Sequence, residues 1–267
     1  MTVRSARSFS LATRARLCAG AGLLVSFSML VAAPAMAGVI AESTRVIFPP
    51  DAREQSLQLV NLNTYPVVVE AWVDDGELDS APEKSTAPVI PLPPIFRLNA
   101  GDQLSLRLLH TGAPLARDRE SLFWLNLYEI PPRPLDLPPD SAILTVAVRT
   151  QMKVFVRPQG LPMAAGEVAG KLGFSLRAEP GRPALHIDNP TPYYASIAAL
   201  QYASAPAAEQ VEALMVAPFG SLDVDLRPPA DAKAEAEAEI VFTLIDDEGN
   251  AVVQTRSVSP ARRPNAP

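Results

Sequence analysis

The chain has 267 residues, and 48% of them are apolar, which is enough for the buried cores of about two domains. Proline is unusually common, with 28 residues, and it interrupts short apolar runs, which disfavours a helical bundle and favours short strands. One cysteine and two histidines exclude a disulfide within the chain and argue against a zinc site built from cysteine and histidine. We therefore expect no metal and no other cofactor.

The first 37 residues have the pattern of a cleavable export signal. The basic start contains Arg4, Arg7, Arg14 and Arg16 and no acidic residue. An apolar run follows at residues 17–33, and residues 35–37 (Ala-Met-Ala) form a small-x-small cleavage site. Because the run is slightly short for a membrane-spanning helix, we predict cleavage after Ala37 and no stable membrane insertion afterwards.

Cleavage would remove four positive charges and no negative ones, so the net charge would change from −6 to −10. An acidic exported protein is a poor partner for nucleic acid, and we expect no nucleic-acid binding. The mature chain would also contain no cysteine. Its stability must therefore come from its core.

Short apolar or alternating runs after residue 38 predict two groups of strands. The first group comprises residues 39–48, 56–61, 67–74, 96–98, 103–109, 122–130 and 142–156. The second comprises residues 170–176, 184–187, 195–202, 214–216, 221–226, 238–246 and 251–258. Such series are typical of immunoglobulin-like β-sandwiches. We predict an all-β protein with an N-terminal domain at 38–158, a C-terminal domain at 159–259, a linker at 157–162 and a disordered tail at 260–267.

Residues 142–156 are the most informative run, because apolar residues alternate along a length well above that of a typical strand. One interpretation is a long central strand of the sandwich. The other starts from the uncharged, proline-free first half, which would aggregate at an exposed edge. Such a segment can serve strand addition, with Leu144, Val146 and Val148 filling the core of a partner.

Five segments resemble, in order, the motifs of the periplasmic pilus (fimbrial) assembly chaperones, the PapD-like family. They are residues 44–49 (Thr-Arg-Val-Ile-Phe-Pro), 93–98 (Pro-Pro-Ile-Phe-Arg-Leu), 118–126 together with 130–132, 151–158, and 189–194 (Asn-Pro-Thr-Pro-Tyr-Tyr). The similarity extends over nearly the whole mature chain. It implies two immunoglobulin-like domains in an L shape with a cleft between them.

The resemblance also implies a function. Such chaperones stabilise newly exported pilus subunits by donor-strand complementation and deliver them to an outer-membrane usher. Here residues 142–148 would be the donor strand, with Leu144, Val146 and Val148 as the donated side chains. Arg45 and Lys153 match the two cations that hold the subunit's terminal carboxylate. Simple alternation places Lys153 on the opposite face of the strand from Leu144.

A charge network between the domains is a further implication of the resemblance. It would comprise Glu120, Arg157 and an acidic residue at the turn, Asp247 or its neighbour Asp246. The short connection from Pro132 to residue 142 and the lack of a cysteine pair resemble the short-loop branch of the family, whose pili are composite rods. A self-capping dimer through the exposed strand is another open expectation.

Other classes fit the sequence less well. The chain has none of the common hydrolase, metalloprotease or phosphate-loop motifs, so we expect no enzyme. His110 and His186 are expected to be packed or surface imidazoles, and the carboxylate pairs 74–75 and 246–247 to be solvated turns rather than calcium ligands. A structural pilus subunit would be shorter, with one domain. An exported two-domain binding protein for another extracytoplasmic partner stays the alternative.

Overall fold

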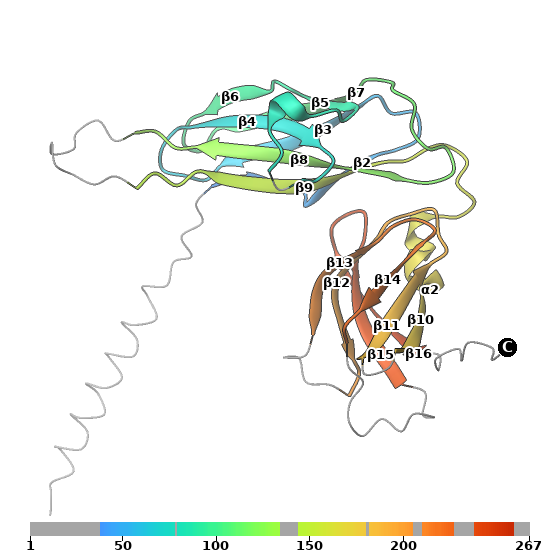
Figure 1. Cartoon of the computed structure of the whole chain (residues 1–267). Helices are drawn as coiled ribbons and strands as arrows, with labels where there is room; N and C mark the ends of the chain where they lie inside the picture. The colour runs from blue at the N-terminus through green and yellow to red at the C-terminus, as the bar shows by residue number, and fades with distance from the viewer. Residues whose placement is uncertain are drawn as a thin grey trace, which may run out of the picture. The chain divides into compact units, whose positions relative to one another are not determined.

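Two β-sandwiches follow one another along the chain, and each has its own hydrophobic core (Figure 1). The computed structural model describes residues 38–77, 79–133, 144–179, 182–204, 210–226 and 238–258. The predicted export signal, the predicted tail and residues 142 and 143 of the predicted donor strand lie outside these ranges. The predicted all-β fold is confirmed.

The N-terminal sandwich contains a four-stranded and a five-stranded sheet (Figure 1). The first has the order β1-β3-β7-β5, with β1 at Val39–Ala41, β3 at Glu54–Asn61, β7 at Gln103–His110 and β5 at Val89–Leu92. The second has the order β2-β9-β8-β4-β6, with β2 at Arg45–Phe48, β9 at Val148–Val156, β8 at Ser121–Ile130, β4 at Val67–Asp74 and β6 at Ile95–Leu98. A short 3-10 helix, η1 (Pro82–Lys84), lies between β4 and β5.

Alternation along the strands builds the N-terminal core. In β3 the buried apolar side chains are Leu57 and Leu59, and in β7 they are Leu106 and Leu108. Successive side chains of a strand point to opposite faces, so one apolar residue in two is enough to cover the inner face of a sheet. Each fully buried leucine contributes about 1.5–3 kcal/mol.

Residues 39–48, predicted as one strand, form two strands in different sheets. β1 pairs antiparallel with β3, whereas β2 pairs parallel with β9. Residues 42–44 (Glu-Ser-Thr) interrupt the apolar run, and the Ser43 hydroxyl donates a hydrogen bond to the Arg45 carbonyl oxygen. The switch of sheets provides a partner for one edge strand in each sheet and places Arg45 beside β9.

Strand β5 was not predicted from the sequence. Pro91 lies inside it, and proline cannot donate a ladder hydrogen bond. In the structure β5 is the last strand in its sheet and pairs only with β7. An edge position tolerates proline, so local sequence alone misjudges this segment.

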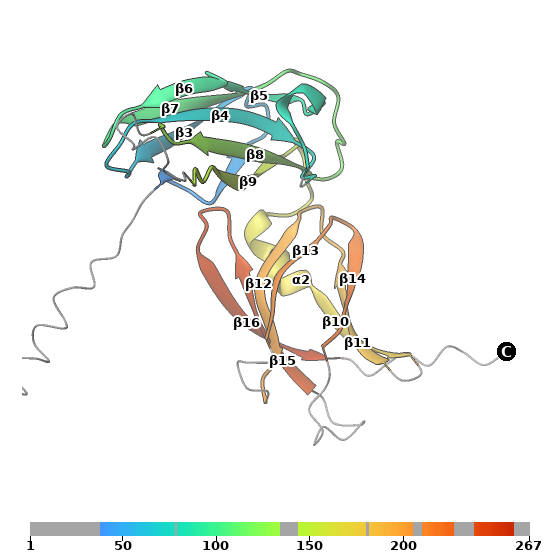
Figure 2. The same ribbon diagram turned by 60° about the vertical axis from the view of Figure 1, so that its left-hand side comes forward.

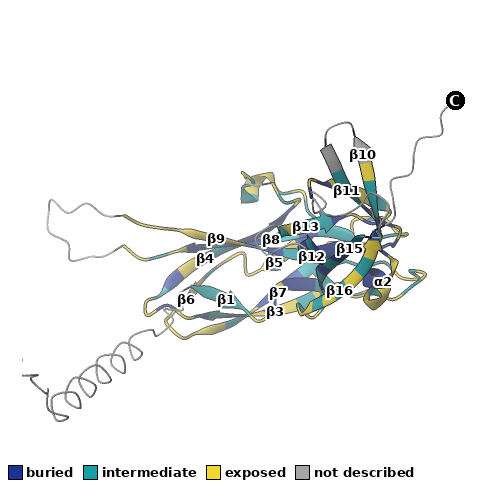
Figure 3. Ribbon diagram, turned by 90° about the horizontal axis from the view of Figure 1, so that it is seen from below, coloured by how far each residue is buried: buried dark blue, intermediate teal, exposed yellow. Residues whose placement is uncertain are grey.

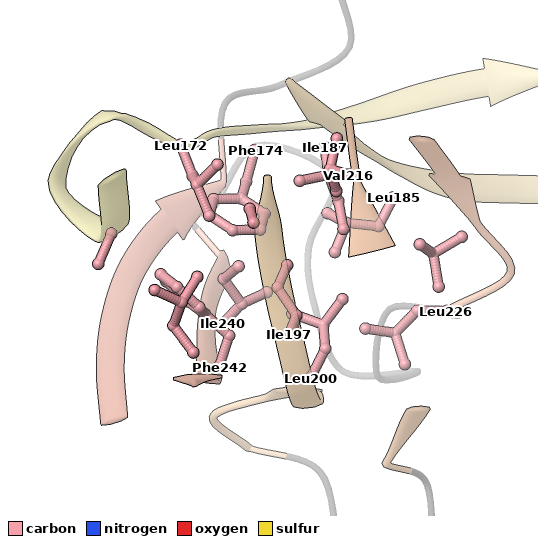
Figure 4. Packing of buried hydrophobic residues seen from close by; sticks show 14 of the residues in the cluster. Leu172, Phe174, Leu185, Ile187, Ile197, Leu200, Val216, Leu226, Ile240 and Phe242 are labelled. Carbon is pink, nitrogen blue, oxygen red and sulfur yellow. The ribbon is translucent and has the colours of Figure 1, made fainter. Parts of the chain in front are cut away.

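The C-terminal sandwich pairs a three-stranded sheet, β10-β11-β14, with a four-stranded sheet, β13-β12-β15-β16 (Figures 1 and 2). The first comprises β10 at Gly173–Glu179, β11 at Arg182–Asn189 and β14 at Gly220–Val224. The second comprises β13 at Val211–Val216, β12 at Ala195–Tyr202, β15 at Ala238–Ile245 and β16 at Ala251–Val258. In the core between them, the rings of Phe174 and Phe242 lie 5.0 Å apart (Figure 4).

The start of this sandwich differs from the prediction. Residues 170–176 were expected to form a strand, but a 3-10 turn, η2 (Ala165–Glu167), and a short helix, α2 (Val168–Lys171), come first, and β10 begins at Gly173. The helix buries Val168 and Ala169 against the C-terminal core. Apolar residues in a run this short fit a helix as well as a strand, so periodicity does not separate the two.

The long predicted strand is also shorter in the structure. β9 begins at Val148, and residues 144–147 have no strand assignment. Figure 3 shows this segment as an exposed trace that leads into β9. The alternation therefore continues beyond the hydrogen-bonded strand. Apolar periodicity without a partner strand does not by itself produce a ladder.

Candidate functional site

Four side chains form one row across the outer surface of the β2-β9-β8-β4-β6 sheet. Arg45 of β2 is opposite Lys153 of β9, and Lys153 is opposite Trp124 of β8. Trp124 is in turn opposite Asp74 of β4. The sequence neighbours of these residues pack in the N-terminal core, so the row lies on the opposite face of the sheet. The parallel pairing of β2 with β9 brings the two predicted anchor cations together.

Arg45 is the first residue of β2 and is only 9% exposed. Its Nη1 donates a 3.2 Å hydrogen bond to the carbonyl oxygen of Ile245, the last residue of β15, so its guanidinium reaches the C-terminal sandwich. Its Nε is buried and has no hydrogen-bond partner among the described residues. Burial lowers the pKa of Arg45, and nearby acidic residues, chiefly Asp247, oppose this shift.

Lys153 is partly buried in the middle of β9. Its Nζ donates a hydrogen bond of 3.4 Å to the hydroxyl of Ser196 in β12 and lies 5.7 Å from the centroid of the Trp124 ring. Burial, together with the positive charge of Arg45, lowers the pKa of Lys153 to about 8. The ammonium therefore stays mostly protonated at neutral pH, with a pKa only about one unit above it.

Within the part of the chain that the structure describes, neither Arg45 nor Lys153 forms an ion pair with a carboxylate. Two adjacent cations that repel each other, with N–H groups still available, favour an added anion. A guanidinium and an ammonium can both donate charge-assisted hydrogen bonds to a carboxylate. The arrangement is suited to binding one carboxylate.

A second cationic centre lies directly after β9, at Arg157. Its Nε donates to Glu120 at 2.7 Å, and its two terminal nitrogens donate to both oxygens of Asp247 at 2.5 and 2.6 Å. Glu120 is 3% exposed, and its other oxygen accepts a hydrogen bond from the backbone N–H of Tyr194. The three residues predicted as a charge network are in direct contact.

The structure distinguishes the two acidic residues left open at the turn. Asp247 contacts Arg157, whereas Asp246 accepts a 2.7 Å hydrogen bond from the backbone N–H of Asn250 and closes the β15–β16 turn. Burial raises the pKa of Glu120, and the charge of Arg157 opposes this shift. Burial would lower the pKa of Arg157, but Asp247 and Glu120 together raise it.

The first half of β9 has one free edge. β8 pairs with β9 from Val148 to Val156, whereas β2 pairs only with residues 153–156. On the side of β2, residues 148–152 therefore have no strand partner among the described residues. The side chains of Leu144, Val146 and Val148 are 88%, 61% and 51% exposed. Such exposure of a row of large apolar side chains beside an unpaired edge is unusual in a stable monomer.

Alternation along β9 separates the two candidate functions of the strand. Met152 and Val154 point into the N-terminal core, and Val148 lies on the same face by alternation. Lys153 lies on the opposite face, in the row with Arg45 and Trp124. Regular alternation along β9 therefore places Lys153 on the face opposite Val148, as predicted for Leu144, without any irregularity in the strand.

The strands of this sheet carry four aromatic residues that their apolar runs would suggest as core residues (Trp72, Phe123, Trp124 and Phe155), but of these only Phe123 belongs to the N-terminal core. Trp72 and Phe155 are buried on the outer face, where the Trp72 indole N–H donates to Asp74. Trp124 is partly buried beside Lys153. The strict alternation of residues 123–127 could have placed Trp124 outward. No local signal pointed to Ser196, because its contact partner is 43 positions away in the sequence.

Each of the two histidines has one polar contact within the described residues, and His110 Nε2 is buried without one. His186 Nδ1 lies 2.6 Å from Asp223, and His110 Nδ1 accepts a hydrogen bond from the Gly112 N–H. In the described ranges no three histidine, cysteine or acidic side chains gather in a way that could hold a metal ion. In the same ranges no helix is long and apolar enough to cross a membrane.

Comparison with known proteins gives a consistent result over both sandwiches. Residues 38–162 match the family described as pili and flagellar-assembly chaperone, PapD N-terminal domain, and residues 167–256 match the pili assembly chaperone PapD, C-terminal domain. The chaperone protein HifB of Haemophilus influenzae is 36% identical over 236 residues, which cover 85% of this chain and 93% of HifB.

Solved structures show the same similarity. The CupB2 chaperone of Pseudomonas aeruginosa superposes with a TM-score of 0.68 and 32% identity, over 82% of this chain and all of that one. A structure of the Salmonella enterica SafA pilin in complex with the SafB chaperone matches with a TM-score of 0.66 and 26% identity, over 84% of this chain and 98% of the matched one.

Proposed function

The chain belongs to the PapD-like family of pilus-assembly chaperones, and we propose that it binds pilus subunits in the periplasm and passes them to an outer-membrane usher. The observation that carries this proposal is the combination of two adjacent cations, Arg45 of β2 and Lys153 of β9, which form no ion pair among the described residues, with a free edge in the first half of β9. The first suits a chain terminus and the second suits an incomplete sheet.

Arg45 and Lys153 would bind the terminal carboxylate of the subunit. A C-terminal carboxylate is ionised at neutral pH, and the two cations present a planar fork and a compact ammonium. Their position next to each other, without a counter-ion in the described chain, supports this role. The carboxylate would relieve the repulsion between them. It would also fix the register in which the subunit lies along β9.

Residues 142–148 would be the donated strand. The exposed side chains of Leu144, Val146 and Val148 would fill the open core of the subunit, each contributing about 1.5–3 kcal/mol when fully buried. The free edge of β9 supports this role, because an added strand can continue its hydrogen-bond ladder. These three side chains would then pack in the core of the subunit and not in the core of the chaperone itself.

The network of Glu120, Arg157 and Asp247 would hold the two sandwiches together while the subunit is bound. Glu120 lies just before β8, Arg157 just after β9 and Asp247 in the β15–β16 turn, so one guanidinium joins both sandwiches. Export through cleavage after Ala37 places the protein where pilus subunits emerge. We expect neither catalysis nor a cofactor. In the absence of subunits, we expect two copies of the chain to pair through their β9 edges in a self-capped dimer.

Co-purification from the periplasm tests this function. The chain is co-expressed with pilin subunits encoded beside it, and the experiment is repeated with Arg45→Ala and Lys153→Ala. We expect a one-to-one complex that both substitutions abolish, with thermal melts showing that each variant still folds. A variant that unfolds grossly would contradict the separation of binding from folding.

A third variant tests the donated strand. Leu144→Glu places a charge in the apolar groove of the subunit and should reduce the yield of the complex strongly. The matched control is Val253→Glu in β16, which changes another exposed apolar side chain (61%) in the other sandwich. An unchanged yield with Leu144→Glu would refute strand donation. No complex with any neighbouring subunit would instead favour an exported protein that binds another extracytoplasmic partner.

A further inference from the structure

Ser196 is a buried polar residue next to the two cations. In β12, Ala195 and Ile197 point into the C-terminal core, so by alternation Ser196 faces away from it. It is nevertheless only 3% exposed. Lys153 of the N-terminal sandwich contacts it, and the Lys153 ammonium donates to the Ser196 hydroxyl at 3.4 Å.

The hydroxyl of Ser196 can also donate a hydrogen bond through its own proton. An ammonium has no acceptor, so the serine oxygen is the acceptor in the contact with Lys153 and its proton is left to donate elsewhere. Within the described part of the chain the hydroxyl has no second hydrogen-bond partner. A buried donor without a partner costs free energy, which a bound acceptor would recover.

Three donor groups without a full set of partners belong to residues that are linked by the pairing of Arg45 with Lys153 and by the contact of Lys153 with Ser196. They are the buried Nε–H of Arg45, the remaining N–H bonds of the Lys153 ammonium and the O–H of Ser196. The first two groups belong to the N-terminal sandwich, whereas the third belongs to the C-terminal one. The combination of two positive charges and a neutral donor matches the acceptor-only oxygens of a carboxylate.

We propose that Ser196 is a third binding residue for the terminal carboxylate of the subunit, donating its hydroxyl proton directly to one carboxylate oxygen. This inference rests on the proposed function, since it concerns the same anchor. It adds that both sandwiches bind the carboxylate, so that anchoring a subunit joins them more tightly. The role differs from that of a residue that only orients Lys153.

Peptide binding by the intact mature chain tests the role of Ser196. The probe is a short peptide in which valine alternates with serine, with one lysine for solubility, prepared with a free α-carboxylate or as the C-terminal amide. Isothermal titration compares the wild type with Ser196→Ala, with Ser196→Thr, which keeps a hydroxyl, and with Ser175→Ala, which removes a hydroxyl elsewhere in the same sandwich.

We expect Ser196→Ala to bind the carboxylate peptide about tenfold more weakly, as for the loss of one hydrogen bond to a charged group. Binding of the amide peptide should change little, Ser196→Thr should recover part of the affinity, and Ser175→Ala should match the wild type. In a Lys153→Met background, Ser196→Ala should still weaken binding of the carboxylate peptide. This last result separates direct donation from the orientation of Lys153.

Two outcomes would overturn the inference. Equal losses for the carboxylate and the amide would show that Ser196 supports the fold of the site, and no loss in the Lys153→Met background would show that it acts only through Lys153. The failure of the proposed anchor has a different signature. In that case the wild type itself would not prefer the carboxylate peptide over the amide.

Discussion

The two cationic centres of this protein differ in how their charge is neutralised. Arg157 contacts the carboxylates of Glu120 and Asp247, and all three of its side-chain nitrogens donate hydrogen bonds. Arg45 and Lys153 lie together without an ion pair to any described residue, and Arg45 Nε has no partner. The first centre is complete within the chain, and the second has an excess of positive charge.

The difference separates a structural role from a binding role. Removing a cation from water costs free energy, which a nearby carboxylate offsets. At Arg157 the protein supplies its own carboxylates. At Arg45 and Lys153 burial lowers the pKa of both cations, and no described carboxylate pairs with them. An unbalanced pair of this kind favours an added anion, as the proposed role in binding the carboxylate of a subunit requires.

The largest expected effect is on the complete centre. Arg157→Met should destabilise the protein by about 3–5 kcal/mol, because it leaves the buried carboxylate of Glu120 without a counter-ion. Urea unfolding followed by tryptophan fluorescence measures it, since both tryptophans lie in the N-terminal sandwich. The double variant Arg157→Met, Glu120→Gln should recover part of the loss. A loss below about 1 kcal/mol would mean that solvent already screens this network.

The next effect concerns the pH dependence of the unpaired centre. A bound carboxylate raises the pKa of the Lys153 ammonium. The affinity of the protein for a carboxylate peptide should therefore be constant below pH 8, the pKa of Lys153 in the unbound protein being about 8, and should fall above it. The expected slope approaches about tenfold per pH unit, as for the loss of one required proton. Titrations of the carboxylate peptide across this range measure it.

The control for this prediction is Lys153→Met, whose weaker binding should not depend on pH over the same range. An affinity of the wild type that stays constant well above pH 8 would contradict the proposed contact between Lys153 and the carboxylate. Arg45 is too basic to titrate in this range, so it cannot mask the result.

A smaller effect is expected on the stability of the free protein. Lys153→Met should stabilise it at neutral pH by on the order of 1 kcal/mol after allowance for solvent screening, because the half-buried charge is removed. Below pH 8 the folded and unfolded states both carry the proton, and the cost of burying the charge is present in full. Between pH 8 and the ordinary lysine pKa, only the unfolded state keeps it, so the wild type gains stability as pH rises.

Urea unfolding of both proteins at neutral and at strongly alkaline pH checks this prediction, and the advantage of the variant should disappear at alkaline pH. A variant that is less stable at neutral pH would mean that contacts with Trp124 and Ser196 outweigh the cost of burial. In that case the positive charge of Lys153 would not lower the stability of the free protein.

The smallest effect is expected where pairing occurs without burial. Arg107 and Glu54 form an ion pair with two contacts, at 2.5 and 2.7 Å, across β7 and β3, but both side chains are about half exposed. Glu54→Gln should leave the urea midpoint close to that of the wild type. A large shift of the urea midpoint would show that two-contact ion-pair geometry stabilises the protein without burial, and burial would then not explain the stabilising effect expected of Arg157.

The fold was largely predictable, because sandwich strands alternate and turn residues separate them. β4, β12 and β16 begin and end as expected, at Val67–Asp74, Ala195–Tyr202 and Ala251–Val258. Predictions failed where the tertiary environment overrides the local pattern. Pro91 is tolerated because β5 lies at an edge, and residues 144–147 alternate without forming a ladder because no strand of the described residues pairs with them.

The candidate site divides in the same way. Resemblance to a family indicated Arg45, Lys153, Glu120, Arg157 and the turn at 246–247, and the structure brings them into two clusters. Trp124 and Ser196 were not found as site residues. Trp124 reads as a core aromatic until its face of the sheet is known, and Ser196 depends on a contact between segments far apart in the sequence.

The sequence by itself determined the all-β class, the succession of two sandwiches and the apolar, uncharged run at residues 144–148, because alternation and turn chemistry are local properties. Only the tertiary structure decided which cations are paired. Charge balance depends on register between strands and on contacts between residues far apart in sequence, such as Arg157 with Asp247, which are 90 positions apart. The same residue type therefore forms ion pairs with two carboxylates at Arg157 and none with a described residue at Arg45.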